Sequence, residues 1–439
     1  MKKVLVYGLG LTGISAAKTL DKMGYDVYTF DKNKKEVKEL KGYNYSPISD
    51  SEICDYDFEF VVKSPGIPPR DEIVKKLREK YEIISDIELS FRLFPEAKII
   101  ATTGTNGKTS TTSMISHILN ESGRKAISVG NIGEGILWQM YENPSAIFSC
   151  ELSSFQLHDV STYKPHIACI TNITEDHIDW HGSFDDYINS KLNICRKQDS
   201  GDFLVINHDD PILVDHKDNF LAKVYEFSSK EEVDRGAYLK GSSIFFKDQG
   251  KNIKLMDVDD LSIIGRHNYE NLMAAILACF IYGVSIEDII RGSKSFKSIE
   301  HRLEFVTDIR GIKVYNDSKG TNVDSSVKAI QSFDKPMVII AGGYDKNIDY
   351  SPYVKEFKKH GKLMVIIGQT TDKLASLCEA YKVNYRKAKD MEEAVKISFD
   401  NLEEGDIFLL SPASASWGMY RNFEERGRDF KEKIEKYKG

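Results

Sequence analysis

The feature that most constrains this chain is a glycine-containing loop between an apolar run and a predicted helix. The segment reads Ile99-Ile100-Ala101-Thr102-Thr103-Gly104-Thr105-Asn106-Gly107-Lys108-Thr109-Ser110. A loop of this kind turns backbone N–H groups inward, where they hold a polyphosphate at the start of the helix. The order of strand, loop, Lys-Thr and helix therefore predicts a site for ATP or GTP, formed by Gly104, Thr105, Asn106, Gly107, Lys108, Thr109 and Ser110.

Two side chains of this loop carry chemistry. Lys108 would place a positive charge on the β- and γ-phosphates, and the hydroxyl of Thr109 would hold Mg²⁺. The match to the common phosphate-loop pattern is imperfect, because Thr102 stands where the first glycine belongs and Gly104 comes later. The alternative is a plain glycine turn capped by Thr109.

The composition is that of an ordinary globular enzyme. The chain has 439 residues, 41% hydrophobic and 29% charged, which is enough for about three domains. A net charge of −7 disfavours a nucleic-acid partner. The 6 cysteines are scattered, which predicts neither a disulfide framework nor a zinc site and suits the cytoplasm. No segment approaches the ~20 apolar residues of a membrane span, and we expect a monomer without a membrane partner.

Apolar runs and helical stretches alternate along the chain, which predicts an α/β protein of mostly parallel sheets with flanking helices. We expect three domains: a Rossmann-like domain at residues 1–92, a P-loop ATPase-like domain at 93–297 and a second Rossmann-like domain at 298–439. Predicted strands lie at 4–7, 27–30, 60–62, 146–148, 167–170, 203–206, 313–315, 337–340, 363–367 and 407–410. The polar part at 213–261 is expected to form a small antiparallel patch, and the lysine-rich stretch 32–41 the solvated face of a helix.

The first domain carries a second glycine pattern. Gly8, Gly10 and Gly13 follow the first predicted strand, and Asp31 closes the next one, which is the dinucleotide-binding pattern in its expected context. Taken alone, this pattern would indicate an NAD-dependent dehydrogenase. The same geometry nevertheless presents a helix N-terminus to any pyrophosphate, including that of a UDP-sugar. Because a separate phosphate loop follows, we prefer two different phosphorylated ligands, and the dehydrogenase is kept as an alternative.

Acidic residues and a histidine follow two further apolar runs. Glu151 comes directly after one run, and Glu175-Asp176-His177 follows the next, where open α/β sheets place their ligands. A carboxylate and an imidazole there could share metal ions with Thr109 and phosphate oxygens. The alternatives are helix capping, favoured for at least one of the two acidic residues, and a structural role for His177. Two other histidines have no comparable context and are expected at the surface: His158 and His181.

The chain resembles the Mur ligases, the ATP-dependent amide-forming enzymes of peptidoglycan precursor synthesis, over nearly its whole length. Four motifs occur in the order found in that family: Gly104–Thr109, Glu151–Leu157, Asn172–His177 and His267–Asn271. Within the family, further features are similar to the members that add D-glutamate: the Gly8–Gly13 loop, Asn316–Asn322, and Leu410–Ser416 continuing into Asn422–Gly427.

This resemblance implies an ATP-dependent ligase that joins D-glutamate to UDP-N-acetylmuramoyl-L-alanine through an acyl phosphate and releases ADP and phosphate. Another Mur-type or folylpolyglutamate-type amino-acid ligase is the nearest alternative. The Mur ligase that adds the third residue, like the folylpolyglutamate synthases, more often shows Asp-Tyr-Ala-His-Asn-Pro where this chain has residues 316–322. A binding module that uses ATP without forming an amide is an alternative of another class.

The resemblance also implies roles for single residues. Lys108, Glu151, His177 and Lys191 would be catalytic, and two Mg²⁺ ions would be held by Thr109, Glu151, His177 and a carbamylated Lys191. ATP would also contact Asn268, Asn271, Arg302 and Asp317. The uridine nucleotide would contact Leu11, Thr12, Asp31, Lys32, Ser64, Gly66 and Asn131. D-glutamate would contact Lys319, Thr321, Lys346, Ser416 and Phe423. A carbamate suits Lys191 because an ammonium would repel Mg²⁺, whereas a carbamate is an anionic oxygen ligand.

Overall fold

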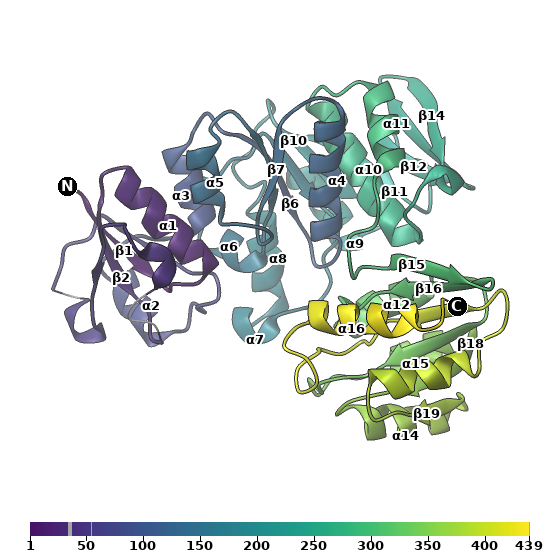
Figure 1. The fold of residues 1–439 in the computed structure, drawn as a ribbon. Helices are drawn as coiled ribbons and strands as arrows, with labels where there is room; N and C mark the ends of the chain where they lie inside the picture. Colours follow the sequence, from purple (N-terminus) through teal and green to yellow (C-terminus); the bar gives the residue numbers. More distant parts are fainter. Residues whose placement is uncertain (34–36, 54, 439) are drawn as a thin grey trace. The chain divides into compact units, whose positions relative to one another are not determined.

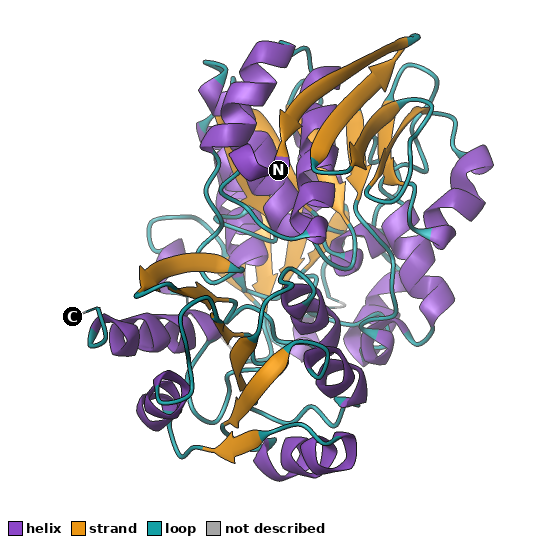
Figure 2. Cartoon of the chain, turned by 90° about the vertical axis from the view of Figure 1, so that its right-hand side faces the viewer, coloured by secondary structure: helices purple, strands orange, loops and turns teal. Residues whose placement is uncertain are grey.

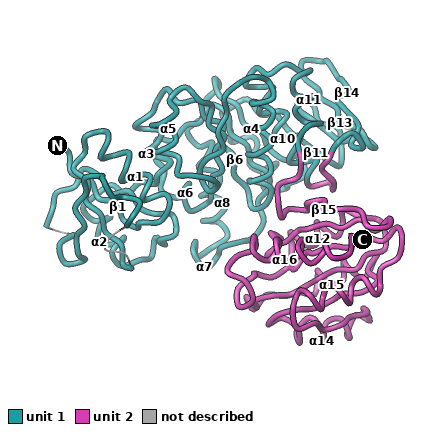
Figure 3. Tube along the Cα trace, in the orientation of Figure 1, with its two compact units in different colours: residues 1–261, 268–296 teal, residues 262–267, 297–439 magenta. Residues whose placement is uncertain are grey.

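The computed structural model of the chain describes residues 1–33, 37–53 and 55–438. These residues form two compact units, one of residues 1–261 and 268–296 and the other of residues 262–267 and 297–439 (Figure 3). The first unit contains two sheets and the second contains one. Within the described part of the chain, no helix combines the length and the apolar character needed to cross a membrane.

The N-terminal sheet is parallel throughout, in the order β3-β2-β1-β4-β5. Its strands are β1 (Lys3–Tyr7), β2 (Asp26–Phe30), β3 (Ser46–Pro47), β4 (Phe60–Lys63) and β5 (Ile83–Ile84). Its helices are α1 (Leu11–Lys22), α2 (Glu72–Arg78) and α3 (Asp86–Leu93). The central strands β1 and β4 are buried apolar runs, as expected for strands covered on both faces.

The middle sheet has nine strands, in the order β14-β13-β12-β11-β10-β9-β6-β8-β7. They are β6 (Lys98–Thr103), β7 (Ala126–Gly130), β8 (Ile147–Glu151), β9 (Ile167–Ile170), β10 (Phe203–Asn207), β11 (Lys223–Ser228), β12 (Gly236–Lys240), β13 (Ser243–Asp248) and β14 (Lys251–Asp257). The helices of this region are α4 (Lys108–Glu121), α5 (Ile136–Glu142), α6 (Ser154–His158), α7 (Ile178–His181), α8 (Phe184–Leu192), α9 (Pro211–His216), α10 (Arg266–Ile281) and α11 (Ile286–Ser295). Helices pack along this sheet in both views (Figures 1 and 2).

The second unit is built on a six-stranded sheet in the order β15-β16-β20-β17-β18-β19. Its strands are β15 (Glu304–Ile309), β16 (Ile312–Asn316), β17 (Met337–Ala341), β18 (Gly361–Ile366), β19 (Tyr385–Lys387) and β20 (Ile407–Leu410), and its helices α12 (Val323–Ile330), α13 (Ser351–Phe357), α14 (Thr371–Tyr381), α15 (Met391–Phe399) and α16 (Phe423–Glu435). Successive residues of β17 face two different cores. Met337 and Ile339 pack with α12, α13 and α14, whereas Val338 and Ile340 pack with α15 and α16.

The predicted α/β class and each predicted strand are confirmed, with two local differences. The segment 213–261 is only partly antiparallel, because β11 and β12 continue the parallel sheet and the antiparallel pairing begins with β13. In the stretch 32–41, residues 34–36 lie outside the described residues, and the described part holds a short 3₁₀ turn, Lys38–Leu40, instead of a helix. The domain limits at 92 and 297 stay a prediction; α3 ends at Leu93 and the second unit resumes at 297.

The N-terminal glycine loop gives a prediction on stability. A Cβ atom at Gly13 would stand 1.9 Å from the carbonyl oxygen of Gly8. Since that obstacle is backbone, Gly13→Ala is expected to lower the free energy of unfolding by about 1–3 kcal/mol. Denaturant unfolding measures the change, with Gly66→Ala as the matched control because nothing lies within 4 Å of a Cβ there. Equal stability of the two variants would contradict the close approach.

Candidate active site

Three neighbouring parallel strands of the middle sheet end at the predicted nucleotide site. β6 lies between β8 and β9 and is parallel to both, so the carboxyl ends of all three meet at one edge of the sheet. The phosphate loop follows β6, Glu151 is the last residue of β8, and Thr171 follows β9. The chain adds strands on one side of β6 up to β8 and then crosses to the other side. Open α/β sheets bind their ligands at such a reversal.

Two glycines allow the phosphate loop to approach its neighbours. Gly104 and Gly107 have φ values of 147° and 88°, which favour glycine. Cβ atoms at these positions would stand 1.9 Å from the Thr171 hydroxyl and 2.1 Å from the Asn271 amide oxygen. Asn271 and Asn268, at the start of α10, are both buried. The Asn271 side chain therefore lies against the phosphate loop. Its contact with the nucleotide stays a prediction.

Asn172 received no predicted role, yet it holds the phosphate loop in place. Its backbone carbonyl accepts a hydrogen bond from the Thr105 N–H at 2.8 Å, and its side-chain oxygen accepts one from the Asn106 N–H at 2.9 Å. Its side-chain N–H₂ donates to the Asn106 carbonyl at 3.0 Å. The Thr105 hydroxyl also lies 3.0 Å from the Tyr187 hydroxyl of α8. The sequence signals for Asn172 are its place two residues after a predicted strand and its position at the start of the Asn172–His177 motif.

Two lysine ammonium groups meet on one carbonyl of this loop. Lys108 and Lys191 donate to the Gly104 oxygen at 2.8 Å and 2.7 Å. Lys191, near the end of α8, is only 1% exposed. Burial, together with the charge of Lys108, holds the pKa of Lys191 well below the usual lysine range. A lowered pKa favours the neutral amine, which is the form that reacts with CO₂.

Glu151 and His177 have surroundings that suit metal ligands. One oxygen of the buried Glu151 accepts from the Asn131 side chain at 3.0 Å, while Oε2 has no hydrogen-bond partner among the described residues. A buried carboxylate oxygen without a donor fits a cation site. His177 has a φ of 53°, in the left-handed region that non-glycine residues seldom adopt. Burial and the charges of Lys108 and Lys191 lower its pKa, which favours the neutral imidazole that binds metals.

Neither Glu175 nor Asp176 caps the helix that follows, so the helix-capping alternative is wrong among the described residues. His177 itself is the N-terminal capping residue of α7, and that position has no side-chain cap. Asp176 instead accepts a hydrogen bond from the His177 N–H at 2.9 Å.

The expectation that His158 and His181 are surface residues is wrong. The side chain of His181 is 0% exposed, with its ring nitrogens 2.7 Å from the Asp186 carboxylate and 3.0 Å from the Ser154 hydroxyl. His158 is partly buried, 3.0 Å from Asp159. Buried imidazoles are favourable where carboxylates and hydroxyls satisfy them. His181 thereby joins α6 to α8, the helix that carries Lys191.

The predicted uridine-nucleotide residues of the first domain follow β1, β2 and β4, which are also three adjacent parallel strands. The Asp31 carboxylate accepts from the Leu9 N–H at 2.6 Å and so lies on the glycine loop. Ser64 lies against the same loop, since a Cβ at Gly8 would stand 2.6 Å from the Ser64 Cβ. A cavity of about 930 Å³ opens beside Asp31 and Lys32, a size suited to a small ligand.

The remaining predicted nucleotide contacts differ in their surroundings. Leu11 is 56% exposed at the start of α1, next to Thr12, and Gly66 has open space around it. Asn131 lies in the middle sheet region against Glu151, where its side chain donates to that carboxylate. Its predicted contact with the uridine nucleotide stays a prediction.

In the second unit, the predicted residues again follow adjacent parallel strands, here β16, β20 and β17. Asp317 follows β16, and its burial raises the pKa of that carboxyl to about 7. It accepts from the Ser411 hydroxyl at 2.8 Å. Arg302 lies between His301 and Leu303, whose φ values are 65° and 44°. Two such residues around one arginine indicate a backbone that its surroundings hold in place.

The predicted D-glutamate residues of this unit follow three strands. Lys319 and Thr321 come after β16, Lys346 after β17, and Ser416 and Phe423 after β20. The Lys319 ammonium lies 5.4 Å from the centre of the Phe423 ring. Arg426, for which no role was predicted, is 1% exposed and connects the segment after β16 to the segment after β20. It donates to the Ser318 carbonyl at 2.8 Å and to the Ser414 carbonyl at 3.0 Å. It also donates to the Ser318 hydroxyl at 3.0 Å, so its role is visible only in the folded chain, where Ser318 and Ser414 come together around it.

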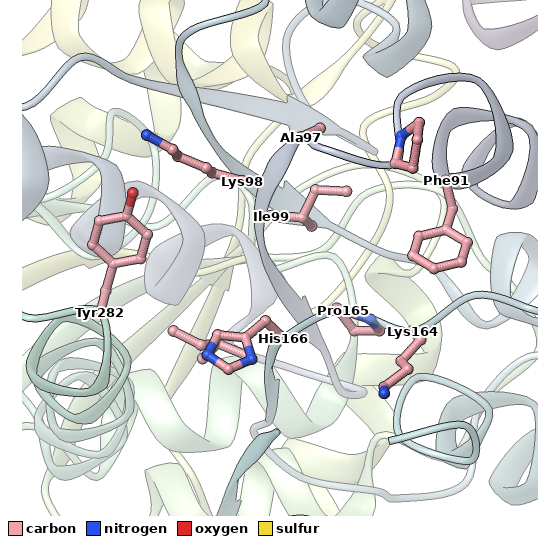
Figure 4. A pocket seen from close by; sticks show the side chains of 10 residues that line it. Phe91, Ala97, Lys98, Ile99, Lys164, Pro165, His166 and Tyr282 are labelled. Atoms are coloured by element: carbon pink, nitrogen blue, oxygen red, sulfur yellow. The ribbon is translucent and has the colours of Figure 1, made fainter. Parts of the chain in front are cut away.

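A second cavity, of about 250 Å³, lies at the opposite edge of the middle sheet (Figure 4). Its lining includes Lys98 and Ile99 at the start of β6 and Ile167 at the start of β9. These are the amino ends of strands whose carboxyl ends meet the phosphate loop. This cavity is therefore separate from the predicted chemistry.

Comparison with known proteins bears on this arrangement. Residues 102–279 match the Mur ligase middle domain, and residues 301–414 match the Mur ligase glutamate ligase domain. A UDP-N-acetylmuramoylalanine–D-glutamate ligase of Thermoanaerobacter pseudethanolicus is 41% identical over 449 residues, covering 99% of this chain and 98% of the relative. The chain belongs to the Mur ligase family. A protein of the same name from Clostridioides difficile is 40% identical, covering 100% of this chain and 99% of the relative.

Solved Mur ligase structures share the fold of the chain. A UDP-N-acetylmuramate–alanine ligase from Thermotoga maritima aligns with a TM-score of 0.62 at 18% identity, covering 99% of this chain and 100% of that one. A MurF ligase from Thermotoga maritima in complex with ADP aligns with a TM-score of 0.59 at 15% identity, covering 94% and 95%. The predicted organisation in three α/β domains is confirmed.

Proposed function

We propose that this Mur ligase uses ATP to join D-glutamate to UDP-N-acetylmuramoyl-L-alanine in peptidoglycan precursor synthesis. One observation carries the proposal: the phosphate loop, the unpaired Glu151 oxygen and the buried Lys191 converge at one sheet edge. The names of the full-length relatives at 41% and 40% identity support the choice of substrates.

In the first step, the carboxylate of the L-alanyl group attacks the γ-phosphorus of ATP. A new P–O bond forms, the bond to ADP breaks, and an acyl phosphate results. Such a transfer depends on positioning and on neutralising the phosphoryl oxygens. Lys108 supplies charge once it exchanges its contacts with the carbonyls of Gly104 and Thr105 for the phosphates. N–H groups at the start of α4 hold the phosphate chain.

In the second step, the amine of D-glutamate attacks the carbonyl carbon of the acyl phosphate. The tetrahedral intermediate loses phosphate and the amine gives up a proton, which leaves the amide. Lys319 and Lys346 would pair with the carboxylates of D-glutamate, with Ser416 and Thr321 as hydroxyl partners. Phe423, whose ring lies 5.4 Å from the Lys319 ammonium, would contribute an apolar face.

Magnesium is part of the proposal. Thr109, Glu151, His177 and a carbamate on Lys191 would hold the two ions, whose charge would offset that of the phosphates. The unpaired Glu151 oxygen and the lowered pKa values of His177 and Lys191 support this assignment. We also propose that the enzyme acts as a monomer in the cytoplasm, where ATP is available.

An isotope experiment tests the proposed chemistry. UDP-N-acetylmuramoyl-L-alanine labelled with ¹⁸O in its carboxylate is incubated with the enzyme, ATP, Mg²⁺ and D-glutamate. Because a carboxylate oxygen becomes the bridging oxygen of the acyl phosphate, it should leave with the released phosphate. Phosphate without the label, despite formation of the amide, would contradict the acyl-phosphate route.

The N-terminal glycine loop gives a prediction about ligands. The full chain should bind the UDP-linked substrate and not NAD, because a separate loop serves ATP and Mur ligase motifs follow that loop. Isothermal titration calorimetry with each ligand measures this. Micromolar binding of NAD without binding of the UDP-sugar would instead support the dehydrogenase alternative.

A further inference from the structure

A buried ion pair links the first two sheets of the chain. Lys63 is the last residue of β4, and Asp159 follows α6; each side chain is 1% exposed, and they lie 3.1 Å apart. Neither residue was predicted to bind a ligand. Burying two charges is costly unless the geometry is good and further hydrogen bonds complete it. The other contacts of the pair therefore indicate what it does.

On its own side, Lys63 closes the turn that follows β4. Its ammonium donates to the Ile67 carbonyl at 2.7 Å. The turn between these residues contains Ser64 and Gly66, two proposed contacts of the uridine nucleotide. The Ser64 N–H donates to the Tyr7 carbonyl at 2.8 Å, which places the turn beside the glycine loop.

On the other side, Asp159 is anchored by several groups. Its carboxylate accepts from Arg78 at 2.6 Å, and its carbonyl accepts from the Ser85 N–H at 3.0 Å. It ends the short segment that runs from Glu151 through α6. Movement of Asp159 would therefore be transmitted over few residues to the Glu151 carboxylate.

A chain of aromatic rings extends from the same ammonium toward His177. Lys63 Nζ lies 5.5 Å from the centre of the Trp180 ring. The Trp180 and Phe155 rings are 4.5 Å apart, and the Phe155 and His177 rings are 4.9 Å apart. Lys63 thus contacts the segments that carry both proposed metal ligands. Its contact with Asp159 leads to Glu151, and its contact with Trp180 leads to His177.

We propose that Lys63 is a positioning residue, which fixes the Ser64–Ile67 turn relative to Glu151 and His177. The inference rests on the proposed function, in which the turn binds the nucleotide end of the substrate and the carboxyl end reacts beside Glu151. Lys63 then sets the distance between those two ends. Since a misplacement of about 1 Å can cost ~10²-fold in rate, loss of Lys63 lowers kcat more than it weakens binding.

The test compares Lys63→Met with Arg78→Met in the full chain. Arg78 pairs with the same Asp159, but its side chain is 44% exposed and it belongs to α2, not to the turn after β4. We expect Lys63→Met to lower kcat for D-glutamate-dependent phosphate release by about tenfold or more, with the Kd for the UDP-linked substrate changed less than about threefold. Arg78→Met should stay within about twofold, because it leaves the contacts of Lys63 with Asp159, the Ile67 carbonyl and the Trp180 ring in place. Thermal melts establish that both variants are folded at the assay temperature.

Hydrogen exchange of the free proteins gives a readout that does not depend on turnover. We expect faster exchange of amides 64–67 and 153–159 together in Lys63→Met, and an unchanged turn in Arg78→Met. If Lys63→Met does not fold, Asp159→Asn, which keeps the shape and removes the charge, decides by the same measurements. Unaltered turnover or unaltered exchange in the turn overturns the inference. If the parent enzyme shows no D-glutamate-dependent turnover, the proposed function fails and the exchange data decide on Lys63.

Discussion

Lys191→Ala is expected to be nearly inactive while it still binds the UDP-linked substrate. The side chain is buried beside the phosphate loop, and its ammonium meets that of Lys108 on one carbonyl. A carbamate at this position would turn a repelling cation into an anionic oxygen ligand. Loss of such a ligand should lower kcat by about a hundredfold or more. Steady-state kinetics and calorimetry of the purified variant measure the two quantities.

Three further observations distinguish a carbamate from a structural lysine. Acetate or another small carboxylate should partly restore the activity of Lys191→Ala, because it can occupy the vacated space. Lys191→Arg should stay inactive, since a guanidinium keeps the charge but cannot be carbamylated. Lys197→Ala, at an exposed lysine after the same helix, is the matched control and should have normal activity. A fully active Lys191→Ala enzyme would contradict the proposed role.

Lys108→Ala is expected to lose turnover and keep its fold. In the transition state, charge spreads over the γ-phosphoryl oxygens, and the lysine at the start of α4 is the group placed to neutralise it. Removing such an interaction costs on the order of 3 kcal/mol or more in activation free energy, which is about a hundredfold in kcat. ADP formation under saturating substrates measures the loss.

The matched control for this variant is Lys98→Ala, at the opposite end of the same strand β6. Lys98 is exposed and lines the cavity at the far edge of the sheet, so its removal should leave kcat unchanged. Near-normal turnover of Lys108→Ala would show that the loop is not where ATP reacts. Equal losses in both variants would indicate a general effect of lysine removal on the domain.

The sheets could be predicted because central parallel strands leave a plain signal. All five residues of β17 are buried, and they form a continuous apolar run. Edge strands leave a weaker sequence signal. β7 contains Ser128 and Gly130. β15 is antiparallel and half-exposed, and it contains Thr307 and Asp308. Neither was predicted. In the polar segment 213–261, the composition indicated strands but could not show where parallel pairing gives way to antiparallel pairing.

The part of the site that could be predicted from the sequence consists of residues that directly follow strands. Parallel strands end at one edge, so Glu151, the phosphate loop and the motif after β9 had to come together. The supporting contacts could not be predicted in this way. His181 with Asp186, Lys63 with Asp159, and Arg426 with two backbone carbonyls join segments that only the folded chain brings into contact. The burial of His181 in particular has no signal in the sequence, since histidine is intermediate in its average burial.

The most direct test of the proposed ligase reaction measures phosphate release from ATP with UDP-N-acetylmuramoyl-L-alanine and one amino acid at a time. D-glutamate, L-glutamate, L-lysine and glycine are compared at equal concentration, and mass spectrometry identifies the product. The proposed reaction predicts release that depends on both the UDP-linked substrate and D-glutamate, with a product heavier by one glutamyl residue. Release with another amino acid in preference to D-glutamate, or ATP hydrolysis that is independent of the amino acid and gives no amide, would contradict it.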